Sequence, residues 1–205
     1  KYNKNTIKIE DFRSQLKNLL VNLNIQKINL VGFSIGALIA IDFASEHKKY
    51  LNSLTLVATT YKRTDEERQR VIDRLNLAKE NKPISKLAMK RWFSDKYLEN
   101  NPAIYKEFMN ILNKSGDDYE NFIKAYDLFA NYIDDETKVK KIDVNTLILT
   151  GSDDPGSTSE MSRELNNDIP KSKFIEIKGG KHLCSIEFAD DVNNAIKEHI
   201  KNEQN

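Results

Sequence analysis

The residues best suited to do chemistry in this chain begin with a serine at position 34. It lies in the run Gly-Phe-Ser-Ile-Gly at residues 32–36, after an apolar run typical of a strand and before a run typical of a helix. A serine at such a sharp turn has its hydroxyl exposed above a sheet, and the helix N-terminus supplies backbone N–H groups beside it. Gly32 and Gly36 allow strand and helix to approach closely, because side chains there would collide. The pattern therefore predicts that Ser34 is a nucleophile.

A serine nucleophile needs a base that removes its proton, and the chain has only 3 histidines. His182 follows two glycines and a lysine in a loop just after a predicted strand, where catalytic side chains can reach the end of a sheet. We expect His47 at a solvated helix C-terminus, where the dipole favours an imidazolium, and His199 beside the apolar stripe of the last helix. His182 is therefore the predicted base, with an ordinary loop histidine as the alternative.

The base in turn needs an acid to orient it, and two aspartates follow a further predicted strand. Residues 146–150 are a β-type run that leads into Gly-Ser-Asp-Asp-Pro at residues 151–155. Asp153 and Asp154 could both simply form the turn, which aspartate does well. The order serine, aspartate, histidine along the chain nevertheless matches the order of the triad in α/β-type hydrolases.

The bulk composition excludes several classes of partner. The chain has 205 residues, enough for one substantial core, and 32 basic against 31 acidic residues give a net charge of +1. This balance creates no global field for nucleic acid or for a membrane surface, so we expect neither as a partner. The longest apolar stretch, residues 30–41, is too short to span a bilayer, and the charged residues 1–10 are unlike a signal peptide.

Cys184 is the single cysteine of the chain. It excludes an intrachain disulfide and any cysteine-rich metal site, and it fits a reducing compartment, so a cytoplasmic location is expected. The sequence also offers no cluster of metal-ligating side chains. We therefore expect neither a metal nor an organic cofactor.

Short β-type runs alternate with helical patterns over most of the chain. The expected strands are residues 28–31, 51–58, 146–150 and 174–177. Helices at the two ends of the chain have these apolar residues at helical spacing: Phe12, Leu16, Leu19, Leu20 and Leu23, then Phe188, Val192, Ala195, Ile196 and Ile200. A capping box at Ser157 and Glu160 predicts the start of another helix. The alternation predicts an α/β fold with a mostly parallel sheet flanked by helices.

Residues 62–135 interrupt this alternation with several consecutive amphipathic helical patterns. A helical block between two strands of a parallel sheet resembles a lid over the carboxyl edge of the sheet, where ligands bind in open α/β folds. The alternative is a set of packing helices away from any site. We accordingly divide the chain into a core, residues 1–61 and 136–205, and an inserted helical lid, residues 62–135.

These motifs in this order resemble the α/β-hydrolase family, from the helix before the nucleophile strand to the C-terminus. In that family the acid usually lies in a Gly-x-x-Asp turn followed by proline, which corresponds to Gly151 and Asp154 and favours the second of the two aspartates. The histidine usually lies in a Gly-x-His segment, which corresponds to Gly180 and His182. The resemblance implies a partial α/β-hydrolase fold with Ser34, Asp154 and His182 as its triad.

Residues 90–94 and 119–126 resemble 3-oxoadipate enol-lactonases and their relatives within this family. This likeness implies a small carboxylic ester or lactone as the substrate. Phe33 and Trp92 are the candidate substrate contacts, although an aromatic residue at helical spacing such as Trp92 is more often part of a core.

The implied reaction is transfer of an acyl group to water. His182 takes the proton of Ser34, whose Oγ attacks the carbonyl carbon, and Asp154 orients the imidazole and stabilises its charged form. The backbone N–H of Ile35 holds the oxyanion. A perhydrolase or haloperoxidase-like activity would use the same triad, and a non-catalytic hydrolase-like binding fragment is a further alternative. Dehalogenase chemistry is disfavoured, because it requires an aspartate in place of Ser34.

Members of the family have several strands before the helix with which this chain begins, and a loop there donates a second N–H to the oxyanion. We find no such segment after Lys1 and expect a C-terminal part of a complete hydrolase, with the nucleophile strand at the edge of the sheet. Losing one oxyanion donor typically costs ~10²–10³ in rate, so the chain is expected to be weakly active.

Overall fold

The computed structural model describes residues 6–113 and 115–202, and these residues form two compact units. The sheet unit comprises Ile9–Lys62 together with residues 134–202, and the helical unit comprises Arg63–Ile133 with residues 6–8. In the sequence, the segment Arg63–Ile133 of the helical unit is one insertion between the second and third strands of the sheet.

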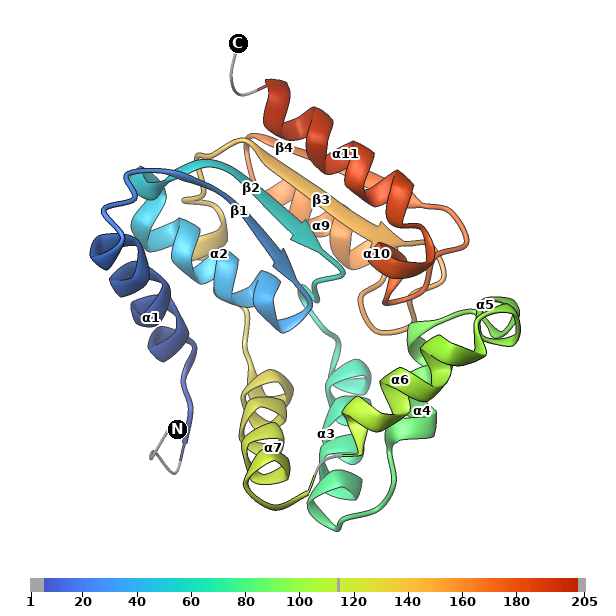
Figure 1. Ribbon diagram of the computed structural model, residues 1–205. Helices are drawn as coiled ribbons and strands as arrows, with labels where there is room; N and C mark the ends of the chain where they lie inside the picture. Colours follow the sequence, from blue (N-terminus) through green and yellow to red (C-terminus); the bar gives the residue numbers. More distant parts are fainter. Residues whose placement is uncertain (1–5, 114, 203–205) are drawn as a thin grey trace. The chain divides into compact units, whose positions relative to one another are not determined.

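Four parallel strands form the sheet, in the order in which they occur in the chain (Figure 1). They are β1 (Ile28–Phe33), β2 (Leu51–Val57), β3 (Thr146–Gly151) and β4 (Ser172–Ile177). The predicted α/β class with a parallel sheet is confirmed, and the ends of every strand lie within two residues of the expected positions. Within the described residues β1 and β4 are the edge strands, so the strand before Ser34 lies at an edge.

The two faces of the sheet carry separate apolar cores, because successive side chains of a strand point to opposite sides. On β3, Ile148 belongs to the core shared with α2 (Ile35–His47) and α9 (Ser159–Asp168). Its neighbour Leu149 belongs to the core shared with α11 (Ala189–Asn202). Helices therefore cover both faces, as is typical of a parallel sheet.

The first helix is present, but only part of its apolar stripe reaches the core. This helix is α1 (Ile9–Asn22), and the other elements of the sheet unit are the 3₁₀ turn η1 (Lys48–Tyr50), α8 (Glu136–Val139) and α10 (Cys184–Glu187).

In the first helix, Ile9 and Leu20 are buried, whereas Leu19 and the following Leu23 are about half exposed. The sequence pattern thus overestimated the width of the buried face.

The start of α9 differs from the predicted capping box. Thr158 is the N-cap residue, and its Oγ1 accepts a hydrogen bond of 3.2 Å from the N–H of Met161. Ser157 instead donates its hydroxyl to the carbonyl of Ala58 at 2.9 Å. The predicted box at Ser157 and Glu160 is therefore wrong, because a distant carbonyl takes the hydroxyl that would have capped the helix.

A buried carboxylate joins three helices on one side of the sheet. Asp42 of α2 is 2% exposed. Its Oδ2 lies 2.8 Å from Nη1 of Arg13 in α1, and its Oδ1 lies 2.9 Å from Nζ of Lys138 in α8. Both cations neutralise a charge that would otherwise be very costly to bury. The three residues therefore link α1, α2 and α8 to one another.

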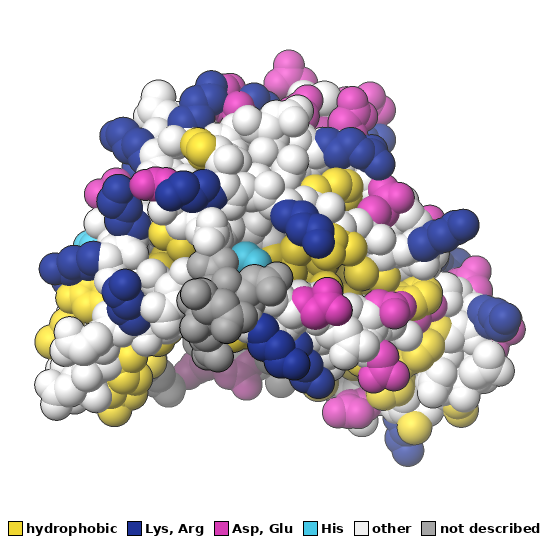
Figure 2. Space-filling view, turned by 90° about the horizontal axis from the view of Figure 1, so that it is seen from above, with side chains coloured by type: hydrophobic (Ala, Val, Ile, Leu, Met, Phe, Trp, Pro, Cys, Tyr) yellow, Lys and Arg dark blue, Asp and Glu magenta, His cyan; other side chains and the backbone are white. Residues whose placement is uncertain are grey.

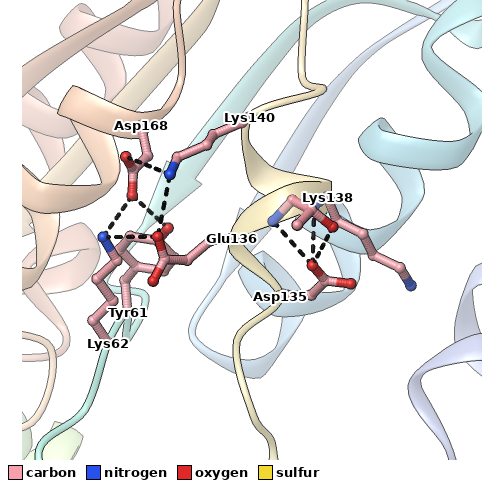
Figure 3. Close-up of polar contacts among 8 residues, drawn as sticks. Tyr61, Lys62, Asp135, Glu136, Lys138, Lys140 and Asp168 are labelled. Atoms are coloured by element: carbon pink, nitrogen blue, oxygen red, sulfur yellow. Dashed lines mark hydrogen bonds and ion pairs between the residues drawn. The ribbon is translucent and has the colours of Figure 1, made fainter.

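A second charged cluster lies where the chain leaves the sheet unit and returns to it (Figure 3). Nζ of Lys62 lies 2.7 Å from Oδ2 of Asp168 and 3.4 Å from Oε2 of Glu136. The hydroxyl of Tyr61 donates to the same Asp168 oxygen at 2.7 Å, and Lys140 lies 3.2 Å from Glu136. The bond from Lys62, followed by that from Tyr61, lowers the pKa of Asp168. The cluster thus ties both connecting segments to the C-terminal end of α9.

The described residues of the helical unit form five helices: α3 (Asp65–Lys79), α4 (Ser85–Trp92), α5 (Asp95–Asn100), α6 (Pro102–Leu112) and α7 (Gly116–Asn131). Thr64 and Glu67 form a capping box at the start of α3. A small core of Val71, Leu75 and Ala130 packs α3 against α7. The consecutive helices expected from the sequence are present, and α5 is a short addition that the apolar spacing did not indicate.

The surface carries charges of both signs. Figure 2 shows acidic and basic side chains interspersed over the face that it presents. This mixture agrees with the net charge of +1. Over the described ranges, none of the helices is long and apolar enough to cross a bilayer.

Candidate active site

Ser34 is the one residue between the end of β1 and the start of α2. Its backbone has φ 54° and ψ −121°, a conformation that costs a residue with a side chain ~1–3 kcal/mol. The N–H of Ser34 donates to the carbonyl of Val57 on the neighbouring strand at 2.9 Å, which holds the turn against the sheet. The strained turn directs the serine away from the strand, as the motif predicts.

Sterics require glycine at only one of the two glycine positions of the motif. A Cβ on Gly32 would lie 2.5 Å from the carbonyl oxygen of Gly36 and 2.7 Å from Cα of Ala37, so only glycine fits there. A Cβ on Gly36 would meet nothing within 4 Å. The steric argument is therefore correct for Gly32 and wrong for Gly36, because the helix approaches the strand at one of the two positions only.

His182 lies between the other two predicted site residues. Its Nε2 is 3.0 Å from Oγ of Ser34, and its Nδ1 is 2.7 Å from Oδ2 of Asp154. Both contacts are satisfied when the ring carries its proton on Nδ1, since that N–H donates to the carboxylate and leaves Nε2 to accept the serine hydroxyl. Three residues from the ends of three different strands are thus joined in one hydrogen-bonded series.

Asp154 is held in place by the backbone of its own loop. It is 4% exposed, and its Oδ1 accepts hydrogen bonds from the N–H groups of Gly156 at 2.8 Å and Ser157 at 3.0 Å. Its other oxygen is therefore left to face His182. The adjacent Asp153 is exposed and accepts a hydrogen bond from Ser152 instead. Of the two candidate acids, it is Asp154 that contacts the histidine.

The loops that carry the aspartate and the histidine touch through two glycines. A Cβ on Gly151 would collide with the backbone carbonyl of Gly180, and a Cβ on Gly180 would lie 2.8 Å from Cβ of Cys184. The N–H of Asp153 donates to the carbonyl of Gly180 at 2.9 Å. The glycines of the Gly-x-x-Asp and Gly-x-His segments therefore let the ends of β3 and β4 approach closely enough for Asp154 to reach His182.

Ile35 is the first residue of α2, directly after Ser34. The first N–H groups of a helix have no partner within the helix, and they lie at the positive end of its dipole. The N–H of Ile35 can therefore donate to an oxyanion formed next to Ser34.

The two predicted substrate contacts lie in different units. The Phe33 ring is partly buried and lies 5.2 Å from the His182 ring between centroids, at an interplanar angle of 50°. Trp92 lies in α4 of the helical unit, where its ring packs edge-on against Phe108 at 6.3 Å. Phe33 thus contacts the predicted base, and Trp92 contributes to aromatic packing among the helices.

The other two histidines do not join the series. The His47 ring is half buried beside the rings of Phe43 and Tyr50, and burial, followed by the charges of Lys17 and Arg13, lowers its pKa. The expectation of a solvated imidazolium at this helix end was therefore wrong. Nε2 of His199 lies 3.1 Å from the carbonyl oxygen of Leu54, which anchors α11 to β2.

Sequence reasoning did not identify the groups that hold the acid. Gly156 and Ser157 follow Asp154 by two and three residues, and an aspartate that accepts from such N–H groups forms an Asx-type turn. The run Asp-Pro-Gly-Ser is a signal for this turn that the sequence carries. Among the described residues, no group of three or more histidine, cysteine, aspartate or glutamate side chains is arranged to hold a metal ion.

The buried thiol near the histidine loop is chemically quiet. Cys184 is completely buried, and burial, followed by the charge of Asp154, raises its pKa to about 11. A thiol with such a pKa is almost entirely protonated at neutral pH and is a poor nucleophile.

A model of the α/β-hydrolase fold family matches residues 3–189, and the chain belongs to this family. It is similar to two proteins of Acinetobacter baylyi. One is (E)-2-((N-methylformamido)methylene)succinate hydrolase, with 27% identity over 194 residues that cover 92% of this chain and 71% of the relative. The other is 3-oxoadipate enol-lactonase 2, with 22% identity over 95% of this chain and 71% of the relative.

Solved structures show the same fold. The crystal structure of the enol-lactonase from Burkholderia xenovorans matches with a TM-score of 0.84 at 21% identity, over 95% of this chain and 74% of that one. The resemblance to α/β hydrolases that the motifs indicated is thereby confirmed, and with it a hydrolase class of enzyme.

Proposed function

We propose that this protein is a serine hydrolase that cleaves a small carboxylic ester or lactone through an acyl-enzyme. The observation that carries the proposal is the hydrogen-bonded series from Ser34 Oγ through His182 to Asp154, with distances of 3.0 Å and 2.7 Å. A nucleophile bonded to a base that is bonded to an acid is the arrangement that acyl transfer requires.

The first half of the reaction forms the acyl-enzyme. The Ser34 proton moves to Nε2 of His182 while Oγ bonds to the carbonyl carbon, and the carbonyl π electrons move onto its oxygen. The N–H of Ile35 donates to this oxyanion. When the tetrahedral intermediate collapses, the bond to the leaving oxygen breaks, and that oxygen takes the proton from Nε2. In a lactone the leaving hydroxyl stays attached to the acyl group.

The second half uses the same base on water. Nε2 of His182 takes a proton from a water molecule, whose oxygen attacks the acyl carbon. Collapse of the second intermediate breaks the bond to Ser34 Oγ, which regains its proton, and releases the carboxylic acid. Throughout, Asp154 keeps the proton of the ring on Nδ1 and stabilises the imidazolium while it carries both protons.

The choice of ester or lactone rests on the relatives. The two similar proteins of Acinetobacter baylyi bear the names of a hydrolase of a substituted succinate and of an enol-lactonase. The second name describes hydrolysis of a lactone and supports an ester or lactone as the substrate of this chain. The first describes hydrolysis of a small dicarboxylate that carries a formamido group, which supports only the small size and the carboxylate of the substrate.

A serine-directed probe and a turnover assay test this function together. We expect a fluorophosphonate probe to label the wild-type protein and the Ser45→Ala variant but not the Ser34→Ala variant. Ser45 is the matched control, since it lies in the same helix and its hydroxyl donates to the carbonyl of Asp42 at 2.9 Å. We further expect the wild-type protein to hydrolyse p-nitrophenyl acetate and a small enol lactone, and Ser34→Ala to hydrolyse neither. A folded wild-type protein that neither labels nor turns over these substrates would contradict the proposal.

A further inference from the structure

The loop that carries His182 is short and depends on the neighbouring loop for its shape. It leaves β4 through Gly179, whose φ of 77° is one that residues with side chains rarely adopt, and the N–H of Gly180 donates to the carbonyl of Ile177 at 3.1 Å. The histidine follows two residues later. Any rotation of this turn moves the imidazole relative to Ser34 and Asp154.

Three hydrogen bonds from the loop after β3 hold this turn. The N–H of Ser152 donates to the carbonyl of Ile177 at 3.0 Å, and the N–H of Asp153 donates to the carbonyl of Gly180 at 2.9 Å. In the opposite direction, the N–H of Gly179 donates to the side-chain Oγ of Ser152 at 2.8 Å. The last bond is the one that depends on the identity of a side chain.

The hydroxyl of Ser152 is itself oriented by a carboxylate. This hydroxyl donates a hydrogen bond of 2.7 Å to Oδ1 of Asp153. A hydroxyl has one proton to donate and two lone pairs to accept with, so donation to Asp153 leaves a lone pair for the N–H of Gly179. Such an O–H to carboxylate bond is stronger than one between neutral groups.

We propose that Ser152, oriented by Asp153, is a positioning residue for His182. The pair holds the Gly179–Gly180 turn in the conformation that places the imidazole between Ser34 and Asp154. This inference rests on the proposed function for its kinetic consequences. It also gives the two adjacent aspartates separate tasks, since Asp154 contacts the histidine and Asp153 fixes the loop that carries it.

The physical reason is the accuracy that proton transfer requires. A reacting group must stay within about 0.5 Å of its productive position, and a displacement of about 1 Å can cost on the order of 10²-fold in rate. A single hydrogen bond contributes modestly to overall stability. Losing the Ser152 bond should therefore loosen the turn without unfolding the protein.

The experiment compares Ser152→Ala with Ser152→Thr, Asp153→Ala and Asp153→Asn. We expect kcat to fall about 3- to 10-fold in Ser152→Ala with KM changed less than about twofold, the size of one hydrogen bond. Ser152→Thr keeps the hydroxyl and should return kcat to within about twofold of wild type. Asp153→Ala should lose less than Ser152→Ala, and Asp153→Asn, whose amide oxygen still accepts, should be close to wild type.

Ser172→Ala is the matched control. Ser172 lies at the opposite end of β4, and its Oγ bonds to the carbonyls of Asn166 and Ile169 at 2.9 Å and 2.8 Å. Removing the Ser172 hydroxyl deletes hydrogen bonds at the start of β4, at the far end of the strand from His182. We expect Ser172→Ala to lower the melting temperature at least as much as Ser152→Ala while kcat stays at the wild-type value.

A second measurement does not depend on turnover. In NMR spectra of the wild-type protein and of Ser172→Ala we expect a sharp Nδ1 proton resonance for His182 and slow amide exchange at Gly179. In Ser152→Ala we expect the resonance to broaden and the Gly179 amide to exchange at least about tenfold faster. If the wild-type protein turned over no ester or lactone, the proposed function would fail, and the spectra would still decide the positioning role. Wild-type kcat and a wild-type His182 spectrum in Ser152→Ala would overturn the inference, as would equal losses of kcat in Ser152→Ala and Ser172→Ala.

Discussion

Two buried aspartates of the sheet unit, Asp42 and Asp154, are 2% and 4% exposed but have different kinds of partner. Asp42 lies between two cations, Arg13 and Lys138. Asp154 accepts from two backbone N–H groups and faces one imidazole. Burial is therefore nearly the same for the two carboxylates, and the difference lies in whether the charge of the partner is permanent.

This difference separates a structural charge from a reactive one. Arginine and lysine keep their charge at neutral pH, so Asp42 is neutralised at all times and its contacts contribute to holding helices together. An imidazole can be neutral or charged, so in the proposed mechanism the interaction of Asp154 with His182 strengthens when the ring takes the proton of Ser34. In the proposed mechanism the same type of side chain thus serves stability in one place and proton transfer in the other.

Replacing Asp154 should give the largest effect on activity. We expect Asp154→Asn to lower kcat by about 10⁴-fold, because an amide no longer keeps the ring proton on Nδ1, while the folded structure is retained. The measurement is kcat on the ester or lactone that the wild-type protein hydrolyses, together with the melting temperature. Asp153→Asn is the control and should stay close to wild type. Activity of Asp154→Asn within tenfold of wild type would remove Asp154 from the proposed triad.

Replacing Asp42 should lower the stability of the protein and leave the reactivity of Ser34 unchanged. We expect Asp42→Asn to lower the free energy of unfolding by about 3 to 5 kcal/mol, because two cations lose the charge that compensates them. Urea denaturation measures this loss, and fluorophosphonate labelling per folded molecule should be unchanged. Asp143→Asn is the control, since its ion pair with Lys171 is about half exposed and should matter little. Unchanged stability of Asp42→Asn would contradict a structural role for this carboxylate.

A substitution at Gly151 tests whether the close contact of the two loops positions Asp154 against His182. In Gly151→Ala the new methyl group would collide with the Gly180 carbonyl and push the loops apart. Because a displacement of about 1 Å can cost on the order of 10²-fold, we expect kcat to fall by about that factor. Gly36→Ala provides the contrast, as its Cβ would meet nothing within 4 Å, and its melting temperature should be equal to or above that of wild type. Equal kcat values for Gly151→Ala and wild type would show that the loops can separate without harm.

A third aspartate, Asp168, is an intermediate case, because one of its partners is a cation, Lys62, and the other is a neutral hydroxyl, that of Tyr61. Its ordinary pKa of 3.8 is lowered in the folded state, first by the bond from Lys62 and then by that from Tyr61. A carboxyl whose pKa is lowered by folding stabilises the protein above its unfolded pKa, and that contribution is lost as the pH falls through the folded value. We therefore expect the wild-type protein to lose stability below about pH 4, and Asp168→Asn to lose less over the same interval.

Urea midpoints at pH 7 and at pH 3 give this measurement. The effect should be the smallest of the four, because the Lys62 side chain is 31% exposed and solvent weakens the ion pair. An identical pH dependence in Asp168→Asn and wild type would assign the acid sensitivity to other carboxyls.

Much of the site was predictable because it lies at the ends of strands. Parallel strands bring their carboxyl ends to one edge of a sheet, so residues that follow β1, β3 and β4 must lie near one another. The order of the residues and the glycines around them were sufficient to name Ser34 and His182 and to limit the acid to Asp153 or Asp154. Which of the two aspartates contacts the histidine came from the family resemblance, and the structure gives the reason in the turn that Gly156 and Ser157 form around Asp154.

Two of the incorrect expectations share a cause. Ser157 failed to cap α9 because the carbonyl of Ala58, 99 residues away in the chain, accepts its hydroxyl. The imidazolium expected at His47 is opposed first by burial of the ring and then by the charges of Lys17 and Arg13 of α1. In each case a local pattern was overruled by a group that packing brings from elsewhere in the chain.

The sequence by itself determined the α/β class, the nucleophile turn and two members of the series, Ser34 and His182, because these follow from local periodicity and from the side-chain types at strand ends. It limited the acid to Asp153 or Asp154, and the resemblance to the family favoured Asp154. Only the tertiary structure decided that Asp42 meets cations 29 and 96 residues away and that Ser152 accepts the N–H of Gly179 from the next loop. Local spacing limits what a residue can contact within its own element. Partners that are distant in the chain are set by the packing of helices on the sheet, which no short pattern encodes.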